Sequence, residues 1–244
     1  MSGHSHWAGI KHKKGVEDAK RGKVFSKLAR IITIAAKEGG DPAMNPKLKD
    51  AIDYARSFNL PKENIERAIK KGTGEIEGAV FEPYTLEAYG PDGIPVIIEI
   101  TTDNKNRALA ELRSILTRYN GKIAGEGSVR WMFEQKGVVV LKLLVDQDEH
   151  TKESWELKAI DAGADDTQWG ENGTLEIYTK PELLQRVEET LTKEGGMSES
   201  TRLEWVSKEE HHIENDEIKK KLRRLFEELD EHDDVQEIYS NVAL

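Results

Sequence analysis

The sequence has 244 residues, of which 37% are hydrophobic, and it carries a formal net charge of −10. This length exceeds that of one typical domain and suffices for two or three small cores. The chain contains no cysteine, which excludes disulfides, thiolate metal sites and a cysteine nucleophile. No run approaches the ~18 apolar residues of a membrane helix and the start has no signal-peptide core, so we expect a cytoplasmic protein.

The positive charge is concentrated near the N-terminus. Residues 1–74 carry 16 basic and 8 acidic side chains, whereas the remaining 170 residues carry 20 and 38. The stretch from Lys11 to Arg30 has eight basic residues and two acidic ones. The positive charges of such a cluster repel one another unless an anion neutralises them. Attraction of an anionic partner depends on the local potential within about 8 Å at physiological salt, and not on the net charge of the whole chain. We therefore expect this region to bind nucleic acid. The candidate contact residues are His4, His6, Trp7, Lys11, His12, Lys13, Lys14, Lys20, Arg21, Lys23, Lys27 and Arg30.

Two features of residues 3–15, called the basic arm here, allow more than one interpretation. Trp7 either stacks on an exposed base or packs on its own domain. If Met1 is removed, the Ser-Gly-His start offers four nitrogens to Cu(II) or Ni(II), but a phosphate contact by His4 is the simpler interpretation. We assign no metal and no cofactor to the protein.

The apolar spacing predicts a helical domain over residues 1–76. A long helix begins near Val16, with its lysines on the face opposite the packing face, and Gly39-Gly40 ends it. Asn45 is expected to cap a second helix, and a third opens at Pro61. The packing face of the first helix is formed by Phe25, Leu28, Ile32 and Ala36.

The pattern then changes to mixed strands and helices. Residues 82–89 and 96–102 are expected to form a hairpin around Gly90-Pro91-Asp92-Gly93. A helix follows, and the alternation of Val129, Trp131 and Phe133 predicts a third strand. At the start of that helix Asp103, Asn104, Asn106 and Arg107 can contact an anion, although capping alone explains the first two.

Residues 137–207 show the order strand, helix, strand, strand, helix, strand, which is typical of the ferredoxin-like plan. The final helix and strand cannot form a core alone, so we expect them to complete the earlier sheet. This makes 137–207 an insertion into a domain of residues 80–136 plus 208–244. The expected fold class is α+β, with an N-terminal helical bundle followed by two ferredoxin-like α/β domains, one inserted into the other.

Common catalytic motifs are absent from the sequence. It has no GxxxxGK phosphate loop, no HExxH and no GxSxG. We therefore expect a protein that is not an enzyme and has no small-molecule substrate. A metal-dependent hydrolase that uses the acidic domains remains an alternative, and a requirement for divalent metal would identify it.

Several segments resemble the YebC/PmpR family: GHSHWAGIKHKK, DAKRGKVFSKLAR, PKENIERAIKKGTGE, EAYGPDG, TTDNKNRA, GSVRWMFEQKG and DDVQEIYSN. The resemblance covers essentially the whole chain and implies a three-domain protein with a helical N-terminal domain. Bacterial members are described as probable transcriptional regulatory proteins that bind DNA. Mitochondrial members include the translational activator of cytochrome oxidase subunit I, and these resemble ribosome-associated translation factors.

We therefore expect a non-enzymatic nucleic-acid-binding regulator of gene expression that does not bind membranes. The alternative is a translation factor that binds ribosomal RNA on the ribosome. The sequence shows no helix-turn-helix spacing with Asn or Gln at a helix start, which favours recognition of backbone or shape.

Overall fold

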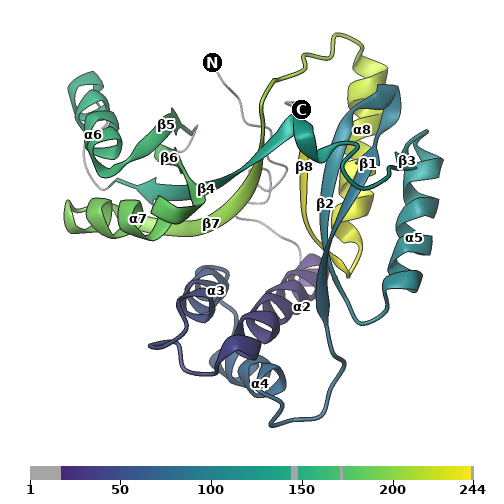
Figure 1. Ribbon diagram of the computed structural model, residues 1–244, viewed down its shortest axis with the longest axis horizontal. Coiled ribbons are helices and arrows are strands. Elements are labelled where there is room, and N and C mark those ends of the chain that lie inside the picture. The colour runs from purple at the N-terminus through teal and green to yellow at the C-terminus, as the bar shows by residue number, and fades with distance from the viewer. Residues whose placement is uncertain (1–17, 144–147, 171–172, 243–244) are drawn as a thin grey trace. The chain divides into compact units, whose positions relative to one another are not determined.

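The structure is a computed structural model that describes residues 18–143, 148–170 and 173–242 (Figure 1). The chain divides into two compact units. The first unit consists of two stretches of chain, one up to Glu134 and one from Val206 onward, and the second unit comprises Gln135–Trp205 between them in sequence. No helix among the described residues is long and apolar enough to cross a membrane.

The first unit begins with a helical bundle. Its helices are α2 (Asp18–Ala35), the short 3-10 helix η1 (Ala36–Glu38), α3 (Pro46–Ser57) and α4 (Lys62–Gly72). The expected packing face of the first helix is confirmed, because Leu28 and Ile32 are buried in the bundle core. Asn45 caps α3 as expected by accepting a hydrogen bond from the Leu48 amide at 3.1 Å. Its side-chain amide also donates to the carbonyls of Ala35 and Gly39, which fastens the end of α2 to the start of α3.

Helix α4 packs closely on α2 at Gly72. A Cβ atom at this position would lie 2.3 Å from the carbonyl oxygen of Thr33 and 2.6 Å from the Cβ of Ala36. Glycine is therefore required for the close approach of the two helices.

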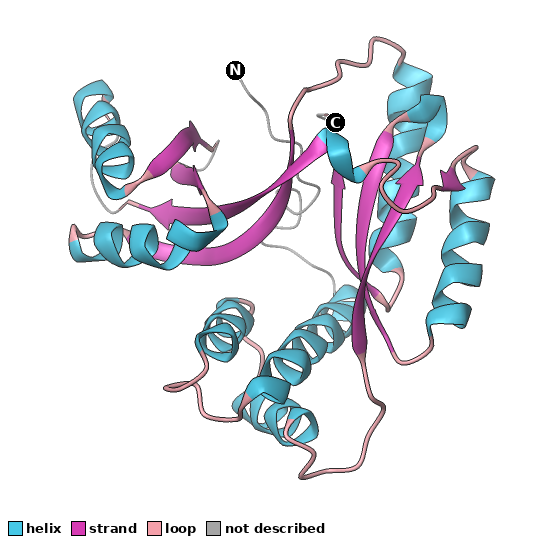
Figure 2. Cartoon of the chain, in the orientation of Figure 1, coloured by secondary structure: helices cyan, strands magenta, loops and turns pink. Residues whose placement is uncertain are grey.

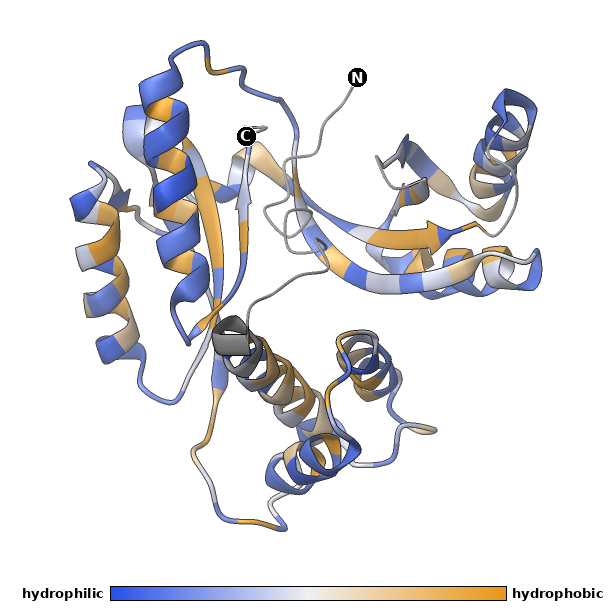
Figure 3. Cartoon of the chain, turned by 180° about the vertical axis from the view of Figure 1, so that it is seen from behind, coloured by the Kyte–Doolittle hydropathy of each residue, from blue (hydrophilic) through white to orange (hydrophobic). Residues whose placement is uncertain are grey.

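The first unit also contains a four-stranded antiparallel sheet. Its strands are β1 (Glu82–Tyr89), β2 (Pro95–Thr102), β3 (Lys122–Ile123) and β8 (Val235–Ser240), in the order β3-β1-β2-β8. The expected β1–β2 hairpin is confirmed, with the 3-10 helix η2 (Pro91–Gly93) at its turn. Helices α5 (Lys105–Arg118) and α8 (Asp216–Glu231) pack through Leu112 and Leu225 on the sheet face that carries Ile98. Figure 3 shows that α8 is hydrophilic along much of its visible face.

The expected third strand around Trp131 is wrong. The strand that pairs with β1 is β3, and residues 130–132 form the 3-10 helix η3 (Arg130–Met132). The alternating pattern did not indicate a strand because Val129 is buried within the loop before η3, whereas Phe133 already begins the next strand, β4. The Val129 and Arg130 amides donate to the Glu87 carboxylate instead of to a neighbouring strand.

The second unit has the ferredoxin-like order that the sequence predicts. Its elements are β4 (Phe133–Lys142), α6 (Glu149–Ala162), β5 (Ala164–Trp169), β6 (Thr174–Thr179), η4 (Pro181–Leu183), α7 (Leu184–Lys193) and β7 (Met197–Ser207). The strands lie in the order β5-β6-β4-β7, as labelled in Figure 1, and Figure 2 draws them as magenta arrows. Trp155 of α6 and Val187 of α7 pack with Leu141 and Ile177 of the sheet to form its core.

The sheet of the first unit reaches the same kind of layered structure by a different chain order. The hairpin β1–β2 precedes α5, and after β3 the chain enters the second unit before it returns through α8 to β8. The return places β8 beside β2, with Ile98 opposite Ile238. Consequently, residues 230–234 lie at the end of the sheet where β2 ends at Thr102.

Candidate nucleic-acid interface

The predicted contact residues fall into three groups. His4, His6, Trp7, Lys11, His12, Lys13 and Lys14 lie outside the described residues. Lys20 and Arg21 belong to α2, but their side chains are outside the described part of the chain. Lys23, Lys27 and Arg30 are described, and they lie on one face of α2 at the spacing of successive helical turns.

This cationic face of α2 contacts the last turn of α8 and the segment that leads from it to β8. Lys23 Nζ donates to the carbonyl oxygen of Glu231 at 3.1 Å. Lys27 Nζ donates to the carbonyl oxygen of Asp230 and, at 3.0 Å, to its carboxylate. Both carbonyls belong to the last turn of α8, where helical carbonyls lack intrahelical partners and the helix dipole is negative. The two lysines therefore cap the C-terminus of α8.

Arg30 extends the same contact by one helical turn. Its guanidinium donates to the Thr101 carbonyl at 3.2 Å, to the Asp233 carbonyl, and to Asp234 Oδ1 at 2.8 Å. Lys27 is only 8% exposed. Lys27 and Arg30 are thus engaged within the chain in this structure, which differs from the expected phosphate contacts. Sequence reasoning missed the acidic run Asp230–Asp234, whose charge complements α2 but which lies about two hundred residues away.

Asp234, directly before β8, links three elements of the first unit. Its side chain is 2% exposed, and its carboxylate accepts hydrogen bonds from Arg30 on α2, Arg107 on α5 and Thr102 at the end of β2. Burial alone would raise the pKa of Asp234. The hydrogen bonds from Arg107, Thr102 and Arg30 outweigh that effect and hold the pKa below its ordinary value, so the carboxylate is ionised at neutral pH.

The start of α5 is capped by the protein itself. Asn104 accepts a hydrogen bond from the Arg107 amide at 3.1 Å, as an N-cap residue does. The Arg107 guanidinium binds Asp234 at 2.8 Å and Asp103 at 3.1 Å, and the hydrogen bond to Asp234 raises the pKa of Arg107. Because the Arg107 side chain pairs with two carboxylates and Asn104 caps the helix, the geometry favours capping over the anion contact considered from the sequence.

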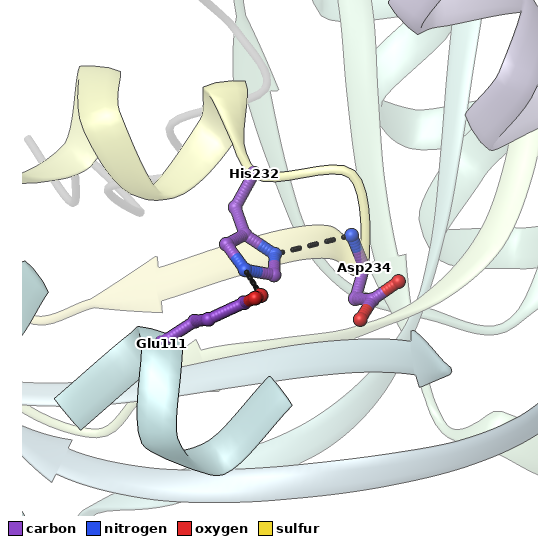
Figure 4. Close-up of side chains that lie close together, drawn as sticks. All are labelled: Glu111, His232 and Asp234. Carbon is purple, nitrogen blue, oxygen red and sulfur yellow. Dashed lines mark hydrogen bonds and ion pairs between the residues drawn. The ribbon is translucent and has the colours of Figure 1, made fainter. Parts of the chain in front are cut away.

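One group of three potential metal ligands occurs among the described residues: Glu111, His232 and Asp234. Figure 4 shows that the Asp234 amide, and not its carboxylate, points toward the imidazole. His232 Nδ1 accepts from that amide at 3.2 Å, which places the ring proton on Nε2, 2.9 Å from the Glu111 carboxylate. The Asp234 carboxylate is bound to two guanidinium groups, whose positive charge opposes a cation. The group is therefore a structural hydrogen-bond network.

Comparison with known proteins covers almost the whole chain. Residues 5–75 match the TACO1/YebC protein N-terminal domain, and residues 81–242 match the TACO1/YebC second and third domain. A protein of Halothermothrix orenii named "Probable transcriptional regulatory protein" is 43% identical over 242 residues, which cover 99% of this chain and 94% of that protein. A protein of Persephonella marina with the same name is 45% identical and covers 100% of this chain and 96% of its own length.

A solved structure agrees with these matches. The crystal structure of a conserved hypothetical protein from Aquifex aeolicus superimposes with a TM-score of 0.87 at 43% sequence identity. The similarity covers 98% of this chain and 97% of that one. The resemblance found in the sequence motifs is therefore confirmed, and this chain belongs to the TACO1/YebC family.

Proposed function

We propose that this protein is a cytoplasmic, non-enzymatic regulator of gene expression that binds nucleic acid through its basic N-terminal region. The observation that carries the proposal is the charge distribution. The first 74 residues have an excess of eight positive charges on a chain whose net charge is −10. A localised excess of this size attracts a polyanion although the whole protein is acidic. The names of the relatives, which describe regulators, support the same interpretation.

The contacts of α2 with residues 230–234 suggest two roles for the cations of this helix. Lys23, Lys27 and Arg30 hold the helix against residues 230–234, so we assign phosphate contact to the arm and to the first turn of α2. The cations of the arm are Lys11, Lys13 and Lys14, and those of the first turn of α2 are Lys20 and Arg21. If these five engage, the logarithm of the affinity should fall with the logarithm of salt concentration with a slope of about −3.5 to −4.5.

The test is a salt titration of the intact protein by fluorescence anisotropy with a labelled RNA and a labelled DNA duplex. Replacing Lys13 and Lys14 by glutamate should weaken binding to every sequence and make the slope shallower by about 2, because two phosphate contacts are lost. The matched control replaces Lys220 and Lys221, an exposed pair on α8, and changes the net charge equally. A salt-independent affinity, or equal losses in both double variants, would refute the proposal.

A second candidate is a translation factor that binds ribosomal RNA. The observation that favours it is the engagement of α2, because a helix whose cationic face contacts residues 230–234 cannot lay that face in a DNA major groove. Irregular RNA offers phosphates and unpaired bases to an arm and to loops instead. At matched salt, structured ribosomal RNA should displace duplex DNA from the protein. Displacement of the RNA by a specific promoter duplex would favour transcriptional regulation.

A further inference from the structure

Trp131 lies exposed on η3, in the loop that follows β3. Its side chain is 64% exposed, which is unusual for the residue with the largest apolar surface. The other large apolar residues that are exposed among the described part of the first unit are Met44, Ile76 and Val80. These belong to the α2–α3 connection and to the segment between α4 and β1. Trp131 is therefore the one aromatic residue among these exposed residues.

A buried carboxylate fixes the loop that carries this ring. Glu87 on β1 is 3% exposed, and it accepts hydrogen bonds from the amides of Gly127 at 2.7 Å, Val129 at 2.6 Å and Arg130 at 3.0 Å. Burial would raise the pKa of Glu87, but these three amides lower it overall, so the group is a carboxylate at neutral pH. Val129 of the same loop is fully buried and anchors it. The backbone beneath Trp131 is consequently preorganised.

The indole is oriented as well as exposed. Its N–H donates to the carbonyl oxygen of Ser128 at 3.1 Å, and the same oxygen accepts from the hydroxyl of Tyr89 at 3.0 Å. Because the polar edge of the indole is satisfied inside the protein, the side chain can offer an aromatic surface without leaving a donor unpaired.

Two cationic residues adjoin the backbone of Trp131. Lys208 donates through Nζ to the Trp131 carbonyl at 2.8 Å and through its amide to the Met132 carbonyl at 3.0 Å. Arg130 directly precedes Trp131 in the chain. Its side chain is 41% exposed, and its Nε lies 3.8 Å from Glu87 Oε1. Glu126 is the exposed carboxylate of the same loop. Cationic residues next to an exposed aromatic residue match the phosphates that flank a nucleobase.

We propose that Trp131 is a stacking platform for one unpaired nucleobase of an RNA target, with Lys208 and Arg130 positioned for the adjoining phosphates. The proposal rests on the nucleic-acid-binding function inferred above and adds a second contact region outside the basic arm. A nucleobase fits this surface better than a protein does, because protein docking requires a contiguous apolar patch of several hundred Å². Stacking requires one ring of fixed orientation, and it tolerates any base sequence.

The test uses the full chain and three probes at one salt concentration: a single-stranded oligouridine, a hairpin RNA with an unpaired loop, and a blunt duplex of the same stem. Trp131→Ala should weaken binding to the oligouridine and the hairpin by about 5- to 150-fold, as expected for loss of one stacked base. Binding to the duplex and the slope of affinity against salt should not change. Trp131→Phe should retain most of the affinity because it keeps a ring.

Two controls separate stacking from other effects. Trp131→Leu keeps an apolar side chain without a ring and should lose as much affinity as Trp131→Ala, which excludes a packing effect. Met44→Ala removes an apolar side chain that is 83% exposed and should have no effect. If Trp131→Ala binds the hairpin as the wild type does, or loses duplex and hairpin binding equally, the stacking proposal is wrong while the basic-arm function stands. If the wild type binds none of the probes, or binds them with an affinity that does not depend on salt, both proposals fail.

Discussion

Replacing Asp234 with alanine should destabilise the first unit by about 3 kcal/mol. The carboxylate accepts three side-chain hydrogen bonds, from Arg30 and Arg107 at 2.8 Å each and from Thr102 at 2.9 Å. Removing one partner of a buried ion pair costs about 3–5 kcal/mol because the remaining charge loses its compensation. The Arg107 side chain is 45% exposed and can be rehydrated, so we expect the lower end of that range.

The measurement is urea denaturation followed by far-UV circular dichroism. The matched control is Asp233→Ala, which removes an exposed carboxylate one residue away and should change stability by less than about 0.5 kcal/mol. A double-mutant cycle with Arg30→Ala should give a coupling free energy between 0.5 and about 3 kcal/mol, since the two side chains are in direct contact. An Asp234→Ala variant as stable as the Asp233→Ala variant would refute the assigned role of this carboxylate.

Three further predictions concern pH, packing and domain independence. The lowered pKa of Asp234 means that its stabilisation is complete above the ordinary pKa near 4 and is lost as the pH falls through the folded-state value; Asp234→Asn should reduce this acid sensitivity in urea titrations. Gly72→Ala should cost about 1–3 kcal/mol by overpacking against Thr33, whereas Gly22→Ala, whose Cβ would meet nothing within 4 Å, should stabilise α2 by about 0.5–1 kcal/mol. Residues 137–207 expressed alone should unfold cooperatively in calorimetry, and a disordered fragment would contradict the inserted-domain organisation.

Local patterns in the sequence were sufficient for much of the fold. The helical face of Leu28 and Ile32, the cap at Asn45 and the turn at Asp92 and Gly93 were predicted because their signals lie within a few residues of the structure they determine. The order of elements in the second unit followed from the same kind of signal.

Contacts between distant segments were not accessible in this way. Periodicity placed Lys27 and Arg30 opposite the packing face, but it could not indicate that Asp230 and Asp234 return to cover that face. The strand expected at Trp131 failed for a related reason, since the amides that would form a ladder bind Glu87 on another element. All the predicted contacts of the arm, from His4 to Lys14, lie outside the described residues and stay predictions.

Sedimentation of a native cell extract tests the central claim, binding of nucleic acid, most directly. At low salt the protein should migrate with ribosomal particles, and treatment with ribonuclease or raised salt should release it, because the proposed contacts are phosphates and unpaired bases. Release by deoxyribonuclease alone would identify DNA as the target and contradict the RNA preference. Migration as free protein at low salt, unaffected by either nuclease, would contradict the account.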